Sequence, residues 1–276
     1  MTGRARREAV LFDGELHPLG LRPGDLADLE FFGVAGALTV ADPVTPVTRK
    51  ALRRSWDALA TGASRRLGRA GLDGYAALGI HPGWIPWRGL EALLAELPEL
   101  LGCPRVVAIG AVGLEEGGLR EEVVFGRQIE LAREVRLPLV VHTPWRSKER
   151  ITRRSLAILR EHEWEPGRAL VVRADARTVR MIRACGYSAG ISLSATGGAS
   201  DPIDEAVRLV ASLGSEGLVL CSGAGEGAGD LLALPRAAAR LAKAGLSRAV
   251  VRRVCGENVV RLLRVEEAVL DGDGQA

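Results

Sequence analysis

Residues 105–141, RVVAIGAVGLEEGGLREEVVFGRQIELAREVRLPLVV, contain two short apolar runs separated by a longer amphipathic stretch. The runs RVVAI (105–109) and LPLVV (137–141) are nearly continuously apolar, which is typical of strands buried on both faces in a parallel sheet. Between them, residues 120–135 place apolar side chains at helical spacing. The segment therefore predicts a strand–helix–strand unit.

The same alternation extends over the rest of the chain. Further strands are predicted at residues 9–12, 34–40, 76–80, 169–172, 188–193 and 217–221, and each is followed by a helical stretch. Eight such units in order favour an α/β fold, a single (β/α)8 TIM barrel with eight parallel strands. An open doubly wound sheet is the alternative, but it calls for a Gly-rich phosphate turn after an early strand, and the sequence has none. We expect an N-terminal extension at 1–8, the barrel at 9–265 and a C-terminal tail at 266–276.

Composition narrows the functional classes. Of 276 residues, 37 are basic and 34 acidic, giving a net charge of +3. Because the two signs are interspersed, no basic stripe indicates a nucleic-acid partner. Four cysteines lie far apart without a CxxC motif, the N-terminus has no signal-peptide pattern, and no apolar run could span a membrane. We expect a cytoplasmic protein without membrane insertion.

Three of the four histidines follow predicted strands. His17, His81 and His142 fall where strands one, three and five end, and the active site of such a barrel forms at these ends. We therefore expect them to share a pocket. His162, at the end of a helix, is predicted to be a surface residue. Trp84, Trp87 and Trp145 lie in loops on the same face as the pocket and could pack as a lid or contact an apolar ligand.

Several stretches in the same order resemble the TatD-like branch of the amidohydrolase superfamily. They are GIHPGWIP (79–86), VVAIGAVGLEEGG (106–118), FGRQIELA (125–132), LPLVVHTP (137–144), GYSAGIS (186–192) and CSGAGEGAGDLLALPRAA (221–238), with FDGELH (12–17) matching less well. The resemblance implies a metal-dependent hydrolase with one or two divalent ions in the barrel mouth. Its pattern supplies a His-x-His pair from strand one, a bridging Glu from strand four, one His each from strands five and six, and an Asp from strand eight. Metals so held lower the pKa of a bound water and polarise the scissile bond.

This chain departs from that pattern at most ligand positions. Strand one reads Glu15-Leu16-His17, the strand-four Glu is Ala111, the strand-six His position is Arg173 and the strand-eight Asp is Gly223. Of the ligands that the resemblance implies, only His17 and His142 remain, and Glu15 could still bind a metal. Arg173 adds a permanent positive charge to a site meant for a cation.

These replacements favour a pseudo-hydrolase, a barrel that serves as a binding or assembly scaffold for an unidentified protein partner. One alternative is a metal-free enzyme or small anionic-ligand binder that uses Arg173, Glu15, His17 and His142, with His81 and Trp145 in the same pocket. Another is a hydrolase with one divalent metal, such as zinc or manganese, held weakly by His17, His142 and Glu15. The first two readings expect no cofactor. In any of them we expect Arg173 to point into the pocket and pair with Glu15 or an anion.

Overall fold

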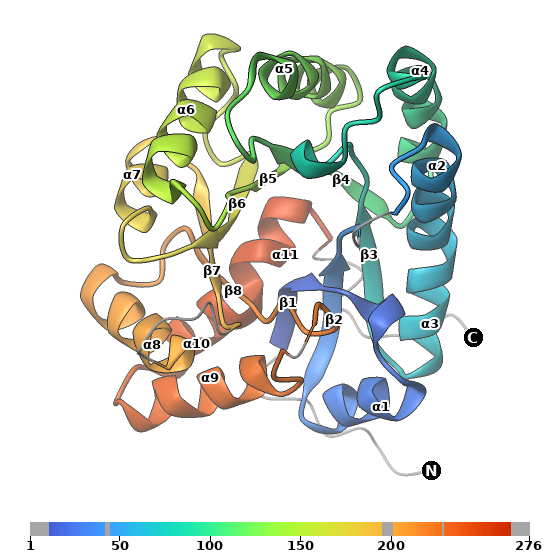
Figure 1. Cartoon of the computed structure of the whole chain (residues 1–276). Helices are drawn as coiled ribbons and strands as arrows, with labels where there is room; N and C mark the ends of the chain where they lie inside the picture. The colour runs from blue at the N-terminus through green and yellow to red at the C-terminus, as the bar shows by residue number, and fades with distance from the viewer. Residues whose placement is uncertain (1–10, 42–44, 195–200, 228, 266–276) are drawn as a thin grey trace.

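The computed structural model describes residues 11–41, 45–194, 201–227 and 229–265, which form one eight-stranded parallel barrel surrounded by helices (Figure 1). The strands are β1 (Leu11–Leu16), β2 (Val34–Thr39), β3 (Asp73–Ala77), β4 (Val106–Gly113), β5 (Leu139–His142), β6 (Ala169–Ala174), β7 (Ser188–Ser192) and β8 (Leu218–Cys221). Each strand pairs in parallel with the next, in the order of the sequence. This confirms the predicted (β/α)8 class.

Helices connect successive strands on the outside of the barrel, and three more helices follow the last strand. The connecting helices are α1 (Pro23–Phe31), α2 (Arg49–Asp57), α3 (Ser64–Arg69), α4 (Leu90–Leu101), α5 (Leu119–Glu134), α6 (Lys148–Glu161), α7 (Val179–Ala184) and α8 (Pro202–Leu213). The helices after β8 are α9 (Ala233–Lys243), α10 (Arg248–Arg252) and α11 (Asn258–Leu263). Between β2 and β3, a π-helical segment, η2 (Ala58–Ala63), separates α2 from α3. No helix in the described ranges is both long enough and apolar enough to cross a membrane.

The barrel closes where the ends of β1 and β8 meet. The Gly223 amide donates to the Glu15 carbonyl and the His17 amide donates to the Ala224 carbonyl, both at 2.9 Å. The Ser222 amide donates to the buried Asp13 carboxylate, also at 2.9 Å. These bonds tie the loop after β8 to β1 and so position Glu15 and His17 at the mouth.

The core has two layers, because strand side chains point alternately inward and outward. The larger cluster lies between the barrel and its helices and includes Trp56, Phe125 and Ile109, all fully buried. A second cluster combines inward-facing strand residues such as Phe12 and Val140 with apolar residues around α11. The interior is therefore packed, and a cavity opens toward the loops at the carboxyl ends of the strands.

The strand boundaries matter for the site. β1 continues to Leu16 and β4 to Gly113, beyond the expected ends at 12 and 109. Glu15 and Ala111 therefore lie within strands and not in loops. The expected N-terminal extension and C-terminal tail lie outside the described residues.

Candidate active site

A cavity of about 220 Å³ opens at the carboxyl ends of the strands. Its lining is Glu15, His17, Val40, Ala41, His81, Gly83, Trp84, Ala111, Glu115, His142, Trp145, Arg173 and Glu226. Six of these are the predicted pocket candidates Glu15, His17, His81, His142, Arg173 and Trp145.

A larger groove of about 770 Å³ contains none of the histidines and is lined by Trp87 and the first turns of α2. Trp84 and Trp145 thus contact the pocket, whereas Trp87 faces this separate groove.

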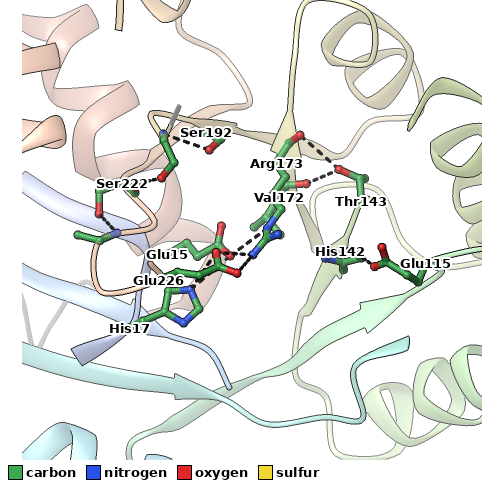
Figure 2. A network of polar contacts seen from close by, with 12 residues as sticks. Glu15, His17, Glu115, His142, Thr143, Val172, Arg173, Ser192, Ser222 and Glu226 are labelled. Atoms are coloured by element: carbon green, nitrogen blue, oxygen red, sulfur yellow. Dashed lines mark hydrogen bonds and ion pairs between the residues drawn. The ribbon is translucent and has the colours of Figure 1, made fainter. Parts of the chain in front are cut away.

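Arg173, near the end of β6, points into the pocket and is held by two carboxylates (Figure 2). Its Nη2 donates to both oxygens of Glu226, at 2.7 and 2.6 Å, and its Nε lies 3.7 Å from Oε1 of Glu15. The Arg173 backbone adopts φ of 60°, a left-handed conformation that is uncommon for a residue other than glycine. Its carbonyl accepts a 2.6 Å hydrogen bond from Nζ of Lys148, which stabilises this backbone conformation.

His17 completes this group on the β1 side. Its Nε2 lies 3.8 Å from Glu15 and 3.9 Å from Glu226, and only 2% of its surface is exposed. Glu15, His17 and Glu226 could together offer three ligand atoms to a cation, since these atoms lie within 4.8 Å of one another. The guanidinium of Arg173 contacts two of the three residues, so a cation already lies against this group.

A second group, from the ends of β3, β4 and β5, consists of His81, Glu115 and His142. Figure 2 shows Glu115 and His142 on the opposite wall from Glu15 and His17. Nε2 of His142 lies 2.7 Å from Oε2 of Glu115. The ring of His81 lies edge-on to that of His142, with centroids 4.3 Å apart, and stacks on Trp84 at 4.2 Å. Nδ1 of His81 accepts the Gly83 amide at 3.1 Å. His81, Glu115 and His142 also bring three ligand atoms within 4.8 Å of one another.

The pKa shifts follow from burial and from this pairing. Burial alone would raise the pKa of Glu15, but the interaction with His17 and the charge of Arg173 outweigh it and lower that pKa. The hydrogen bond to His142 lowers the pKa of Glu115. Burial, together with the nearby charges of His142 and Arg173, puts the pKa of His81 well below its usual value, so His81 is neutral at physiological pH. Burial also lowers the pKa of Lys148 to about 8.

The lining contains more acidic than basic side chains. Glu15, Glu115 and Glu226 supply three carboxyl groups, and Arg173 is the one Lys or Arg among the lining residues given above. The lowered pKa values of Glu15 and Glu115 favour their ionised forms, and His81 is neutral. In a confined site this balance attracts a cation or a hydrogen-bond donor more strongly than a free anion.

Two of these lining residues were not predicted from the sequence. Glu115 and Glu226 both lie within motifs that carry the resemblance, VVAIGAVGLEEGG and CSGAGEGAGDLLALPRAA. The sequence signal that could have identified them is a carboxylate shortly after a predicted strand end, since Glu115 follows β4 and Glu226 follows β8. The three residues predicted to hold a single metal fall in two groups of possible ligand atoms, Glu15 and His17 in one and His142 in the other. Gly223 does not line the cavity; its φ is 62°, and a Cβ there would lie 2.7 Å from Oγ of Ser194.

Comparison with known proteins is consistent with this geometry. The family model described as TatD related DNase matches residues 50–221. An uncharacterised metal-dependent hydrolase of Methanocaldococcus jannaschii is 28% identical over 213 residues, covering 77% of this chain and 83% of that protein. The crystal structure of a TatD-like protein from Archaeoglobus fulgidus superposes with a TM-score of 0.78 at 28% identity, over 92% of this chain and 99% of the other. The phosphotriesterase homology protein of Escherichia coli shares the fold, with a TM-score of 0.71 at 16% identity over 93% and 99% of the two chains.

Proposed function

Since this chain belongs to the family of TatD-related DNases, we propose that it is a pseudo-hydrolase of that family, which keeps the pocket at the barrel mouth as a small-ligand site and does without a two-metal centre. The observation that carries the proposal is the salt bridge of Arg173 to Glu226 and Glu15 inside the pocket. A guanidinium cannot lose its charge at any physiological pH, so it excludes a metal ion from the space it occupies.

The donor set at the expected ligand positions does not fit two ions. Ala111 lines the cavity and carries no donor atom, and Gly223 has no side chain. Arg173 is a cation with five N–H donors and no lone pair to offer. What remains is Glu15 and His17 on one wall and His142 on the other, each already in a polar contact.

The charge balance of the lining also bears on the ligand. Glu226, whose side chain is 38% exposed, takes both contacts of Arg173 Nη2. An anion that binds at this nitrogen therefore requires Glu226 to move. With that side chain in place, the pocket favours a small ligand that donates hydrogen bonds to Glu15 or Glu115 and packs against Trp84 and Trp145.

A one-metal hydrolase is the second candidate, and one observation favours it. His81, Glu115 and His142 present a ligand set of the type found in one-metal hydrolases, two imidazoles and a carboxylate.

Elemental analysis tests the proposal. The protein is purified with zinc or manganese present at every step. We expect at most one ion per chain. The variant that combines Glu15→His, Ala111→Glu and Arg173→His should bind more metal than the wild type, and Arg173→Lys, which keeps the charge, should not. Gly223→Asp is best added separately, because the left-handed backbone there is unfavourable for a side chain. Close to two tightly held ions in the wild type would overturn the proposal.

A further inference from the structure

The wall of the pocket formed by the ends of β3, β4 and β5 has a donor set of its own. His81 follows β3, Glu115 follows β4 and His142 ends β5, and their ligand atoms lie within 4.8 Å of one another. Three donors around a zinc-type ion at about 2.1 Å are separated by roughly 3.4 Å in tetrahedral geometry. Nε2 of His142 and Oε2 of Glu115 lie 2.7 Å apart and the other pairs lie within 4.8 Å, so side-chain rotations bring the three donors to this spacing.

The chemistry of the three donors is also suitable. Glu115 offers carboxylate oxygens, and both imidazoles can offer a lone pair when neutral. His142 and Glu115 now contact each other directly, at 2.7 Å. A bound ion would replace the proton between them, because imidazole and carboxylate can then both coordinate the same positive centre.

Coordination by His81 has an identifiable cost. Nδ1 accepts the Gly83 amide in a short helical turn, η3 (Pro82–Trp84). A neutral imidazole has a single lone pair, so binding a metal requires this hydrogen bond to break or the ring to turn over. The bond is exposed, so the freed amide can be hydrated, and its loss is small compared with a metal–nitrogen bond.

The positive charge nearest to this wall is largely compensated. Arg173 is neutralised by Glu226 and Glu15 on the other side of the pocket. The lining as a whole keeps an excess of carboxylates, which favours one additional cation.

We propose that His81, Glu115 and His142 form a site for one divalent transition-metal ion of the zinc class. Of these three, only His142 occupies a ligand position that the family resemblance implies. Three protein ligands leave a fourth position open for water or a ligand group. The inference goes beyond the pseudo-hydrolase proposal and does not depend on it, since one ion on this wall is compatible with Arg173 on the other.

Zinc and cobalt(II) titrations of the full chain test the inference. Competition with a chromophoric chelator gives the stoichiometry and affinity for zinc, and the visible absorption of cobalt(II) reports its ligand environment. His81→Ala and Glu115→Gln remove donors of the proposed site. Glu15→Gln and His17→Asn remove the same residue types from the opposite wall, and His162→Ala controls for the loss of a histidine near the surface. Thermal melts of each variant distinguish lost metal binding from lost folding. His81→Gln removes the same imidazole as His81→Ala but keeps a polar side chain.

We expect one zinc ion per wild-type chain and an affinity lower by at least about tenfold in His81→Ala and in Glu115→Gln. Affinity in the other three variants should stay within about threefold of the wild type. The cobalt(II) spectrum should change with Glu115→Gln and remain unchanged with Glu15→Gln. Absence of binding to the wild type, or binding lost only with Glu15 and His17, overturns the inference and leaves the pseudo-hydrolase proposal standing. Two ions per chain would instead contradict that proposal.

Discussion

Both oxygens of the Glu226 carboxylate contact Nη2 of Arg173, so this half-exposed side chain controls access to the fixed positive charge of the pocket. Glu15, the other partner of Arg173, is buried and approaches only Nε, at 3.7 Å. Of the two, Glu226 can leave into solvent at lower cost, because its charge remains partly hydrated.

Glu226→Gln should therefore strengthen anion binding. Removing one negative charge in contact with Arg173 should raise the affinity for inorganic phosphate about tenfold, equivalent to roughly 1.4 kcal/mol. Isothermal titration calorimetry with phosphate measures the change, and Glu116→Gln, a carboxylate that does not line the pocket, is the matched control. Unchanged or weaker phosphate binding in Glu226→Gln would show that Arg173 is not accessible to anions.

Asp13 is a second residue whose charge state is linked to the fold. Burial raises its pKa to about 6, although its carboxylate accepts the Ser222 and Glu15 amides. The unfolded chain has the ordinary pKa of about 3.9, so the folded state retains a proton between these values. The stability from this group is present below about pH 4 and is lost as pH rises through about 6.

Asp13→Asn keeps an oxygen acceptor for both amides and removes the buried charge. We expect this variant to be more stable than the wild type at pH 8, by about 1–3 kcal/mol, and the difference to shrink by roughly 1 kcal/mol or more at pH 5. Urea unfolding of both proteins at the two pH values measures it. A difference that does not depend on pH would mean that the pKa of Asp13 is not raised in the folded protein.

At the scale of elements, α5 holds the loop that carries His81. Gln128 on α5 is fully buried; it accepts the Ile80 amide through Oε1 at 2.6 Å and donates to the Ile80 carbonyl through Nε2 at 3.1 Å. Trp56 of α2 supports the same segment through a 3.0 Å bond to the Gly79 carbonyl. Two helices thus set the position of the residue next to His81.

Gln128→Leu should loosen that segment. It leaves the buried amide and carbonyl of Ile80 without partners, at a cost of about 2–4 kcal/mol in the free energy of unfolding. Zinc affinity should fall as well, since His81 loses its position, while Gln128→Glu, which keeps one acceptor, should lose less stability. Chemical denaturation and the zinc titration are the measurements. Full retention of metal affinity in a folded Gln128→Leu protein would exclude the positioning role.

Much of the barrel could be predicted at this scale, because continuous apolar strands and helical periodicity are local properties of the sequence. The runs RVVAI and LPLVV became β4 and β5 with small shifts in their ends. The π-helical segment η2 could not be predicted, since it depends on how residues 58–63 pack against the barrel and not on their hydrophobicity. The strand ends that place Glu15 inside β1 and Ala111 inside β4 could not be predicted either, since they also depend on packing in three dimensions.

At the scale of the whole molecule, the barrel brings two polar groups from distant parts of the chain to opposite walls of one small pocket. One combines β1, β6 and the loop after β8, and the other combines the ends of β3, β4 and β5. The sequence indicated that the histidines and Arg173 would converge, because strand ends of such a barrel meet at one mouth. It did not indicate that Glu226 would pair with Arg173 or that Glu115 would pair with His142. The contacts of a loop side chain depend on the three-dimensional path of the loop, which local sequence patterns do not give.

The central claim is that Arg173 has replaced the two-metal centre, and a crystal structure tests it most directly. The crystals are grown with excess zinc, and anomalous data are collected at the zinc edge. We predict at most one anomalous peak in the barrel mouth, located between His81, Glu115 and His142, with the guanidinium of Arg173 still paired to Glu226 and Glu15. Two peaks a few ångströms apart, with Arg173 turned out of the pocket, would contradict the claim that this residue has replaced the metal centre.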